Sequence, residues 1–429
     1  MRVLVAGAYG LIGTYVTARL LADGHAVRGL GRDVAMARRR QPEVEWVAAD
    51  FGRLEVAQWA PMLRGVDAVV NCVGALQDGP RDDLRAVHDE GVRRLLTACE
   101  AAGVGRIVHI SAVGVEPGTT EAFVATKADA EAALAVSSLH WTILRPGLVI
   151  APAAYGGTGL LRGLAGLPGV VPVVHGDSTV QVVSVEDVAA AVALALEPGA
   201  PPGRRLDLVH AQAWPLAELL PALRAWLGLP PARHVRVPPR LARVAARLSD
   251  GLAWLGWRSA MRSAALAQLR RGVGGDAGHA ASLGLQPASL GQMLAHWPAG
   301  IQERWFARAY FVKPLLLATL ALFWILSGLI ALGRGSDAVA VLAPSAFPAA
   351  LAPLAVAAGA WVDITLGAAV CLRRTARAAL LGMLAVTAVY LVGATLLRPD
   401  LWLDPLGPLL KTIPAGCAAV AALALLEER

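Results

Sequence analysis

The first thirteen residues constrain the fold of this chain more than any other stretch. Residues 3–6 form a short apolar run, which is typical of a strand buried on both faces of a parallel sheet. Gly7 then permits a tight turn, Gly10 lets the backbone approach a phosphate, and Gly13 lets a helix pack closely against the strand. The free N–H groups at the start of that helix, expected over residues 14–21, would bind a pyrophosphate.

Short apolar strands and amphipathic helices alternate after this opening. We expect further strands within residues 24–32, 44–50, 66–74, 106–114 and 141–150, and a helix over 86–102. Short links between such elements imply right-handed crossovers. The fold class is therefore α/β, with a doubly wound parallel sheet of the Rossmann type.

The end of the second strand bears on the choice of nucleotide. Arg32 stands there, and an arginine at this position suits the 2′-phosphate of NADP. Asp33 follows directly, and an acidic residue would instead bind the ribose 2′-hydroxyl of NAD. We expect NADP(H) as the cofactor and keep NAD as the second choice.

The G-x-x-G-x-x-G spacing and the segments after it resemble the extended and atypical short-chain dehydrogenase/reductase (SDR) superfamily, over about residues 1–300. The resemblance implies that Asp50 meets the adenine edge and that Phe51 packs on the adenine ring. It also implies that Pro146 belongs to an Arg-Pro-Gly turn over the nicotinamide. The cofactor contacts implied in this way are Gly7, Tyr9, Gly10, Leu11, Ile12, Gly13, Arg32, Asp50, Phe51, Cys72, Val73, Gly74, Ser111, Lys127 and Pro146.

The catalytic residues of the superfamily are matched only in part. Ser111 and Lys127 stand where a serine polarises the substrate carbonyl and a lysine holds the nicotinamide ribose. Phe123 stands where the tyrosine acid would be, and a phenyl ring cannot donate a proton. Ser111 and Lys127 are the candidate catalytic residues, although Ser111 can equally be a polar strand end that positions a ligand.

The chain divides into three expected domains: 1–213, a nucleotide-binding domain; 214–304, a mainly helical substrate-side lobe; and 305–429, a membrane domain. Within the lobe, Trp226, Trp254 and Trp257 accompany an arginine-rich helix with Arg240, Arg243 and Arg247. Such a helix suits a bilayer surface, but the same pattern is common on soluble lobes.

The apolar excess of the chain, with a mean hydropathy of +0.54, is concentrated after Lys313. Four stretches are candidates to span a bilayer: Pro314–Leu332, Ala350–Leu372, Ala378–Leu397 and Pro408–Leu426. Basic residues before the first stretch and in the loop 373–377 predict a cytosolic N-terminal part by the positive-inside rule. Four spans would return the C-terminus to the same side of the cytoplasmic membrane, and no signal peptide is visible.

Two ionisable residues accompany these stretches. Asp363 lies inside the second stretch, where burial of a carboxylate costs free energy, so we expect this residue to have a functional role. The Lys411 side chain can reach the membrane interface. The four stretches, Asp363 and the Trp-x-Asp-Pro-Leu-Gly-Pro segment from Trp402 resemble the DoxX-like membrane family over about residues 305–426. That resemblance implies a redox reaction in the membrane, which in some members of the family is the reduction of a quinone.

The net charge of +7 suits an anionic cofactor and an anionic membrane surface, and no basic-aromatic module for nucleic acid is present. The four cysteines and the histidines show no metal-ligand spacing, so no metal site is predicted. We expect a membrane-anchored NADP(H)-binding oxidoreductase acting on a lipophilic acceptor such as a quinone. The alternatives are a non-catalytic NAD(P)(H)-binding sensor or scaffold, and a transporter that uses Asp363.

Overall fold

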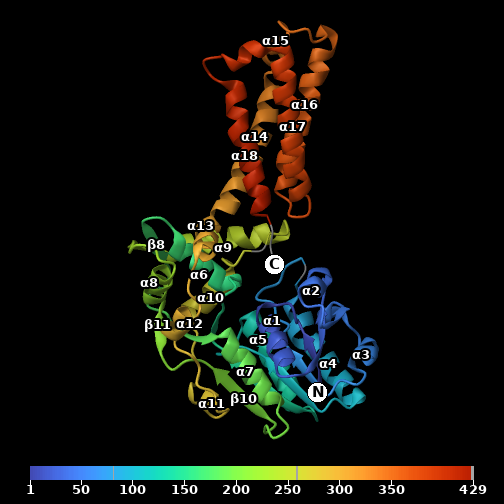
Figure 1. Cartoon of the computed structure of the whole chain (residues 1–429), viewed down its shortest axis with the longest axis vertical. Coiled ribbons are helices and arrows are strands. Elements are labelled where there is room, and N and C mark those ends of the chain that lie inside the picture. The colour runs from blue at the N-terminus through green and yellow to red at the C-terminus, as the bar shows by residue number, and fades with distance from the viewer. Residues whose placement is uncertain (81, 258, 427–429) are drawn as a thin grey trace. The chain divides into compact units, whose positions relative to one another are not determined.

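A computed structural model describes residues 1–80, 82–257 and 259–426 (Figure 1). The chain forms two compact units. The α/β unit comprises Met1–Asp250 and Ser259–Arg304, and the helical unit comprises Gly251–Arg258 and Trp305–Arg429. Arg81 of the expected first domain and residues 427–429 of the expected third lie outside the described residues.

A seven-stranded, wholly parallel sheet forms the centre of the α/β unit, in the order β10-β6-β5-β4-β1-β2-β3. The strands are β1 Arg2–Ala6, β2 Ala26–Gly31, β3 Glu45–Ala48, β4 Ala68–Asn71, β5 Arg106–Ile110, β6 His140–Pro146 and β10 Arg204–Leu208. The predicted doubly wound α/β fold is confirmed. The strand order reverses between β1 and β4, and ligands of such sheets bind at the carboxyl ends of the strands at this switch point.

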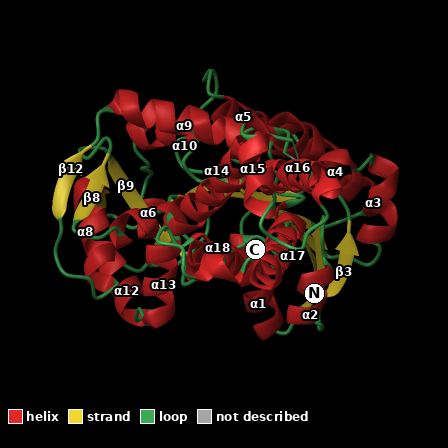
Figure 2. Cartoon of the chain, turned by 90° about the horizontal axis from the view of Figure 1, so that it is seen from above, coloured by secondary structure: helices red, strands yellow, loops and turns green. Residues whose placement is uncertain are grey.

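Helices cover both faces of the sheet (Figure 2). One face carries α1 Leu11–Ala22 and α7 Val185–Leu196, with α2 Ala35–Arg40 near the edge. The other face carries α3 Val56–Leu63, α4 Gly91–Ala102 and α5 Ala122–Ala135. A 3₁₀ turn, η1 Phe51–Arg53, follows β3, and one π-helical turn, η2 Ala86–Glu90, leads into α4. The central strands β1 and β4 are buried between the layers, which explains their apolar runs.

The remaining elements of the α/β unit form small sheets and short helices. One small sheet contains β7 Leu148–Ile150, β9 Thr179–Ser184 and β11 Ala213–Pro215. The other pairs β8 Val170–Val173 with β12 Arg233–Arg236. The helices are α6 Gly156–Gly166, α8 Leu216–Trp226, α10 Ser263–Arg271, α11 Gly278–Ala281 and α12 Leu290–His296. Two further helices, α9 Pro239–Trp254 and α13 Ile301–Ala309, continue from one unit into the other.

The helical unit contains three helices long and apolar enough to cross a membrane among the described residues: α14 Val312–Gly333, α16 Ala352–Val370 with the preceding turn η3 Ala349–Leu351, and α17 Ala376–Leu397. They correspond to the first three predicted spans. The short helix α15 Gly335–Leu342 lies between α14 and α16, and the turn η4 Pro399–Trp402 follows α17.

The fourth predicted span is shorter than expected. It forms α18 Pro408–Ala424, whose 17 residues extend over about 25 Å, less than the roughly 30 Å hydrocarbon core. Gly407 precedes it in the left-handed conformation and Pro408 occupies its first turn, so the helix cannot start earlier. Leu409, Ala419 and Ala422 are buried against its neighbours.

Candidate functional site

The glycine turn between β1 and α1 is shaped by close backbone contacts. Gly7 adopts φ +74°, and a Cβ there would lie 3.1 Å from backbone atoms of Cys72 and Val73, which follow β4. This backbone conformation is open to glycine and strained for other residues. The turn therefore brings the ends of β1 and β4 together at the switch point.

The start of α1 has the properties of an anion site. Gly10 is its N-cap and supplies no side-chain hydrogen bond, and the first N–H group bonded within the helix is that of Thr14, to the Gly10 carbonyl at 3.0 Å. The N–H groups of Leu11, Ile12 and Gly13 precede that bond and face the turn. A side chain at Gly10 would crowd the carbonyl of residue 7, at 3.1 Å from its Cβ. The cradle fits the pyrophosphate of a dinucleotide.

At the end of β2, Tyr9 is bound to the backbone. Its hydroxyl accepts hydrogen bonds from the N–H groups of Arg32 at 3.1 Å and Asp33 at 3.2 Å. The Arg32 guanidinium donates to the Asp82 carboxylate at 2.9 Å. A 2′-phosphate at this end of the strand would have to compete with Asp82 for the arginine.

Phe51, which we expect to pack on the adenine ring, has a largely buried side chain. Phe51 is only 3 % exposed, and its ring packs edge-on against Trp59, with 5.7 Å between the ring centroids. The side chain fills the core beneath the sheet because the η1 turn directs it inward, where Gly91 leaves room for it. Asp50 stays partly exposed beside it.

Ser111 belongs to a buried ionic network. Its hydroxyl donates to Glu131 Oε1 at 2.5 Å, and the Glu131 side chain is only 4 % exposed. The Arg145 guanidinium donates two hydrogen bonds to the same carboxylate in a bidentate ion pair. Arg205 Nε lies 3.5 Å from Glu131 Oε2. Because the Ser111 hydroxyl already donates its hydrogen bond to Glu131, it cannot donate to a substrate carbonyl at the same time. The geometry favours the interpretation of Ser111 as a polar strand end.

Lys127 is buried beside this network. Its Nζ donates to the Ile110 carbonyl at 3.2 Å and lies 5.6 Å from the centre of the Phe123 ring. Burial lowers the pKa of Lys127 to about 8, although the nearby Glu131 carboxylate acts in the opposite direction. The amine is thus still mainly protonated at neutral pH, but it loses its charge far more readily than an exposed lysine.

Two histidines and an asparagine complete the site, and the sequence did not single out the histidines. His88 Nε2 accepts the N–H of Ala75 at 3.0 Å, and its ring lies edge-on to Phe123. His109 Nδ1 lies 3.1 Å from Asn71 Nδ2, while its Nε2 is buried without a hydrogen-bond partner in the described part of the chain. Burial lowers the pKa of both rings, that of His109 to about 3, so both are neutral at pH 7.

One signal could have indicated this pair. Asn71 and His109 are paired in the parallel register of β4 and β5, near the ends of adjacent strands. Polar residues at such ends meet at the ligand-binding edge of the sheet. The buried Nε2 of His109 is an orphaned polar atom near Lys127, consistent with a site that takes a polar ligand.

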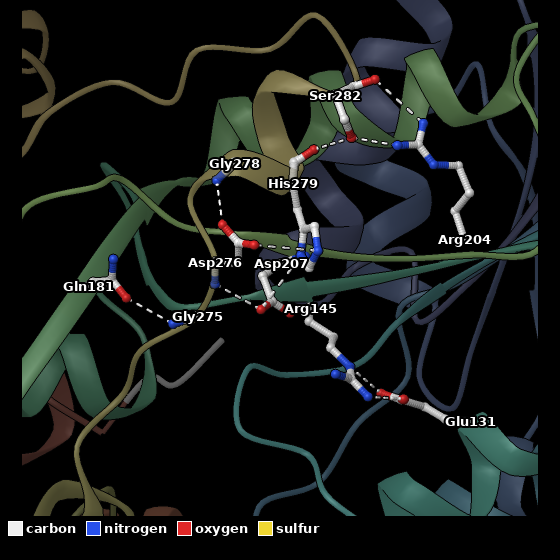
Figure 3. Close-up of polar contacts among 10 residues, drawn as sticks. All are labelled: Glu131, Arg145, Gln181, Arg204, Asp207, Gly275, Asp276, Gly278, His279 and Ser282. Carbon is white, nitrogen blue, oxygen red and sulfur yellow. Dashed lines mark hydrogen bonds and ion pairs between the residues drawn. The ribbon is translucent and has the colours of Figure 1, made fainter.

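A loop after α10 is fastened to the end of the sheet next to Arg145 (Figure 3). The N–H of Gly275 donates to the Gln181 side chain at 2.8 Å, and the N–H of Asp276 donates to the Asp207 carboxylate at 3.0 Å. Asp207 is the register partner of Arg145. A Cβ at Gly275 would lie 2.8 Å from Asp207 Oδ2, so the loop can approach this closely only with glycine.

Asp363 in α16 has a partner within the helical unit. The Tyr390 hydroxyl of α17 donates to Asp363 Oδ1 at 3.1 Å, and the Asp363 side chain is buried. A Cβ at Gly359, one turn earlier, would lie 2.9 Å from that hydroxyl. The carboxyl group thus joins two of the apolar helices through a hydrogen bond.

Comparisons with known proteins agree with this architecture. Residues 7–198 match a family described as NAD(P)H-binding, and residues 321–420 match the DoxX-like family. The (4-alkanoyl-5-oxo-2,5-dihydrofuran-3-yl)methyl phosphate reductase of Streptomyces griseus subsp. griseus is 31% identical over 229 residues, 53% of this chain and 74% of that protein. The ceramide reductase of Caulobacter vibrioides is 28% identical over 189 residues, 44% of this chain and 58% of that protein.

The fold also matches solved structures. The NADPH-dependent quinone oxidoreductase QOR2 of Escherichia coli gives a TM-score of 0.54 at 22% identity, covering 68% of this chain and 99% of that one. At this identity the likeness concerns the fold alone.

The parallel sheet, its switch point and the glycine cradle define a dinucleotide-binding protein of the Rossmann type. More particularly, the chain belongs to the NAD(P)H-binding, SDR-like family and carries a DoxX-like membrane domain at its C-terminal end.

Proposed function

We propose that this protein is a membrane-anchored oxidoreductase that uses NADP(H) to reduce a lipophilic acceptor such as a quinone. The observation that carries the proposal is the combination, in one chain, of a glycine cradle for a dinucleotide with a set of apolar helices. The reductase relatives support the reaction type, and the ceramide reductase among them is named for a lipid substrate.

The residues present would hold the cofactor in a definite way. The N–H groups of Leu11 and Ile12 would bind the pyrophosphate, Arg32 the 2′-phosphate and Lys127 the nicotinamide ribose. When bound, the dinucleotide supplies a hydride. Lys127 also brings a positive charge to a buried position, which favours an anionic ligand.

The absence of a tyrosine acid at Phe123 restricts the acceptor. A ketone that receives a hydride becomes a strongly basic alkoxide, which needs a proton donor, and Ser111 already donates to Glu131. A quinone that receives a hydride becomes a phenolate, whose conjugate acid has a pKa of about 10. That oxygen can take its proton from water, so one hydride and one proton yield the hydroquinone without a tyrosine.

The direct test is NADPH oxidation by the purified full-length protein in detergent with a short-chain quinone. We expect saturable oxidation with one hydroquinone formed for each NADPH consumed. Gly10→Trp is the control, because its side chain would fill the pyrophosphate cradle. Turnover no greater than that of Gly10→Trp would contradict the proposal.

Arg32 should set the preference between the two nucleotides. We expect Arg32→Ala to weaken NADPH binding about tenfold or more, since it removes a charge-assisted hydrogen bond, and to leave NADH binding nearly unchanged. Fluorescence titration of both nucleotides measures the ratio. Arg40→Ala, at an exposed arginine of α2, is the matched control. A ratio that does not move in Arg32→Ala would argue for NAD as the natural cofactor.

The alternative is a sensor or scaffold that binds NAD(P)(H) without chemistry, and the engaged Ser111 hydroxyl together with Phe123 favours it. Phe123→Tyr discriminates between the two, with Phe123→Leu as the control. If the site is otherwise competent, we expect Phe123→Tyr to reduce short ketones about 100-fold faster than the parent. If the parent and the variant both bind NADPH but reduce neither quinones nor ketones, the sensor is the better description.

The proposed orientation places the α/β unit and the C-terminus in the cytosol, with the helical unit in the cytoplasmic membrane. The basic residues before α14 and in the loop 373–377 support this orientation, because cationic residues are retained on the cytosolic side.

A further inference from the structure

Helix α9 has three distinct faces. Small residues line the first face of the helix, and all four of them are buried: Ala242, Ala246, Ser249 and Ala253. They recur at intervals of three and four residues, so they form a single stripe by which the helix packs on the protein. The only acidic residue of the helix, Asp250, is paired with Arg262 at 3.2 Å and with Ser263 at 2.5 Å.

The second face is apolar and uncovered. Leu241, Val244, Leu248 and Leu252 are between 45 % and 66 % exposed. At 3.6 residues per turn, these four side chains fall within an arc of about 80°. A continuous exposed stripe of this kind differs from singly scattered apolar residues and marks an interaction surface.

The third face is cationic and adjoins the apolar stripe. Arg240, Arg243 and Arg247 are all exposed, and none of them forms an ion pair with a residue that the structure describes. Helical spacing places them within an arc of about 60°. Trp254, which is 74 % exposed, falls on the same side. Arginine and tryptophan beside an apolar stripe are the composition of helices that lie in the membrane interface.

The C-terminal end of α9 and the residues after it are anchored inside the helical unit. The Trp257 indole N–H donates to the Cys371 carbonyl at 2.6 Å, and the N–H of Arg373 donates to the Leu255 carbonyl at 3.0 Å. Lys313 lies over the Trp257 ring, with its Nζ 5.9 Å from the centroid. These partners stand where α14 begins and where α16 ends. Residues 255–257 are thus held at the level where two apolar helices reach their ends.

We infer that α9 is an interfacial helix whose stripe of Leu241, Val244, Leu248 and Leu252 inserts among the headgroups of a bilayer, while its three arginines bind anionic lipid phosphates. Two observations favour lipid over a protein partner. The helix continues directly into a segment fixed at the ends of the apolar helices, and its uncovered charge is wholly positive. This inference does not depend on the proposed catalytic activity.

The test uses the full-length protein in nanodiscs of zwitterionic lipid alone or with one quarter anionic phosphatidylglycerol. A nitroxide is attached at Leu248→Cys, in a background in which the exposed Cys371 and Cys417 are alanine. The matched control is a nitroxide at Val136→Cys, an exposed apolar position of the α/β unit that is 87 % exposed. We expect the label at 248 to be several-fold less accessible than that at 136 to a water-soluble relaxant, and more accessible to oxygen.

The arginines are tested by Arg243→Glu combined with Arg247→Glu. We expect this charge reversal to restore access of the water-soluble relaxant to the label at 248, most strongly in discs with anionic lipid. An unchanged thermal unfolding curve shows that the fold is retained.

Equal accessibility at positions 248 and 136 would overturn the inference. So would protection of position 248 that appears only when each disc holds more than one copy, because a second copy would then cover the stripe.

Discussion

Replacing Gly13 with alanine should disable the nucleotide site. A Cβ at Gly13 would lie 2.9 Å from the Cα of Ala8 and closer still to the Gly7 carbonyl oxygen. Both contacts are with backbone, which can yield only if the turn between β1 and α1 opens. Overpacking of this kind costs about 1–3 kcal/mol. The displaced helix start would in addition lose its alignment with the pyrophosphate, so we expect NADPH affinity to fall at least about 30-fold.

Fluorescence titration with NADPH and thermal unfolding of the purified protein measure the two effects. Gly291→Ala is the matched control, because Gly291 lies in α12 with no atom within 4 Å of an added Cβ. That variant should bind NADPH normally and be as stable as the parent or slightly more so. Undiminished NADPH affinity in Gly13→Ala would show that the cradle is not the binding site.

Glu131→Ala should strongly destabilise the α/β unit. Glu131 is buried, and its carboxylate is the shared partner of Ser111, Arg145 and Arg205. Alanine would leave the Arg145 guanidinium without its counter-charge in a partly buried position. Removal of one partner from a buried ion pair costs about 3–5 kcal/mol, so we expect the unfolding midpoint to fall by about 10 °C.

The control is Glu121→Ala, which removes the same side chain from an exposed ion pair with Arg271. Exposed pairs contribute about 0–1 kcal/mol, so its unfolding midpoint should shift little. Calorimetry of both variants provides the comparison. Equal shifts would mean that the network around Glu131 is screened by solvent and does not stabilise the fold.

Most of the fold could be predicted from local sequence. The apolar run at 3–6, the spaced glycines and the strand–helix alternation predicted the sheet, because a buried parallel strand has a recognisable composition. The apolar helices were predictable for a similar reason, since length and hydropathy are properties of one contiguous segment. The fourth helix begins at Pro408 as predicted but ends at Ala424, two residues before the predicted end.

The candidate site was only partly predictable. Ser111 and Lys127 were found by resemblance. Glu131, which accepts the Ser111 hydrogen bond, was not, because that bond joins α5 to a residue that follows β5. His88 and His109 were passed over for the same reason. Phe51 was assigned to the nucleotide, whereas the direction of its side chain depends on the space left by Gly91 and on the Trp59 ring.

The sequence by itself therefore determined the layered nucleotide-binding fold and the membrane helices, because their signals lie within contiguous stretches of composition and spacing. Only the tertiary structure decided which side chains meet at the carboxyl ends of the strands, which proton donors are already engaged, and which face of α9 remains uncovered. Those properties arise from contacts between residues far apart in the chain, and their energies depend on burial that no single segment specifies.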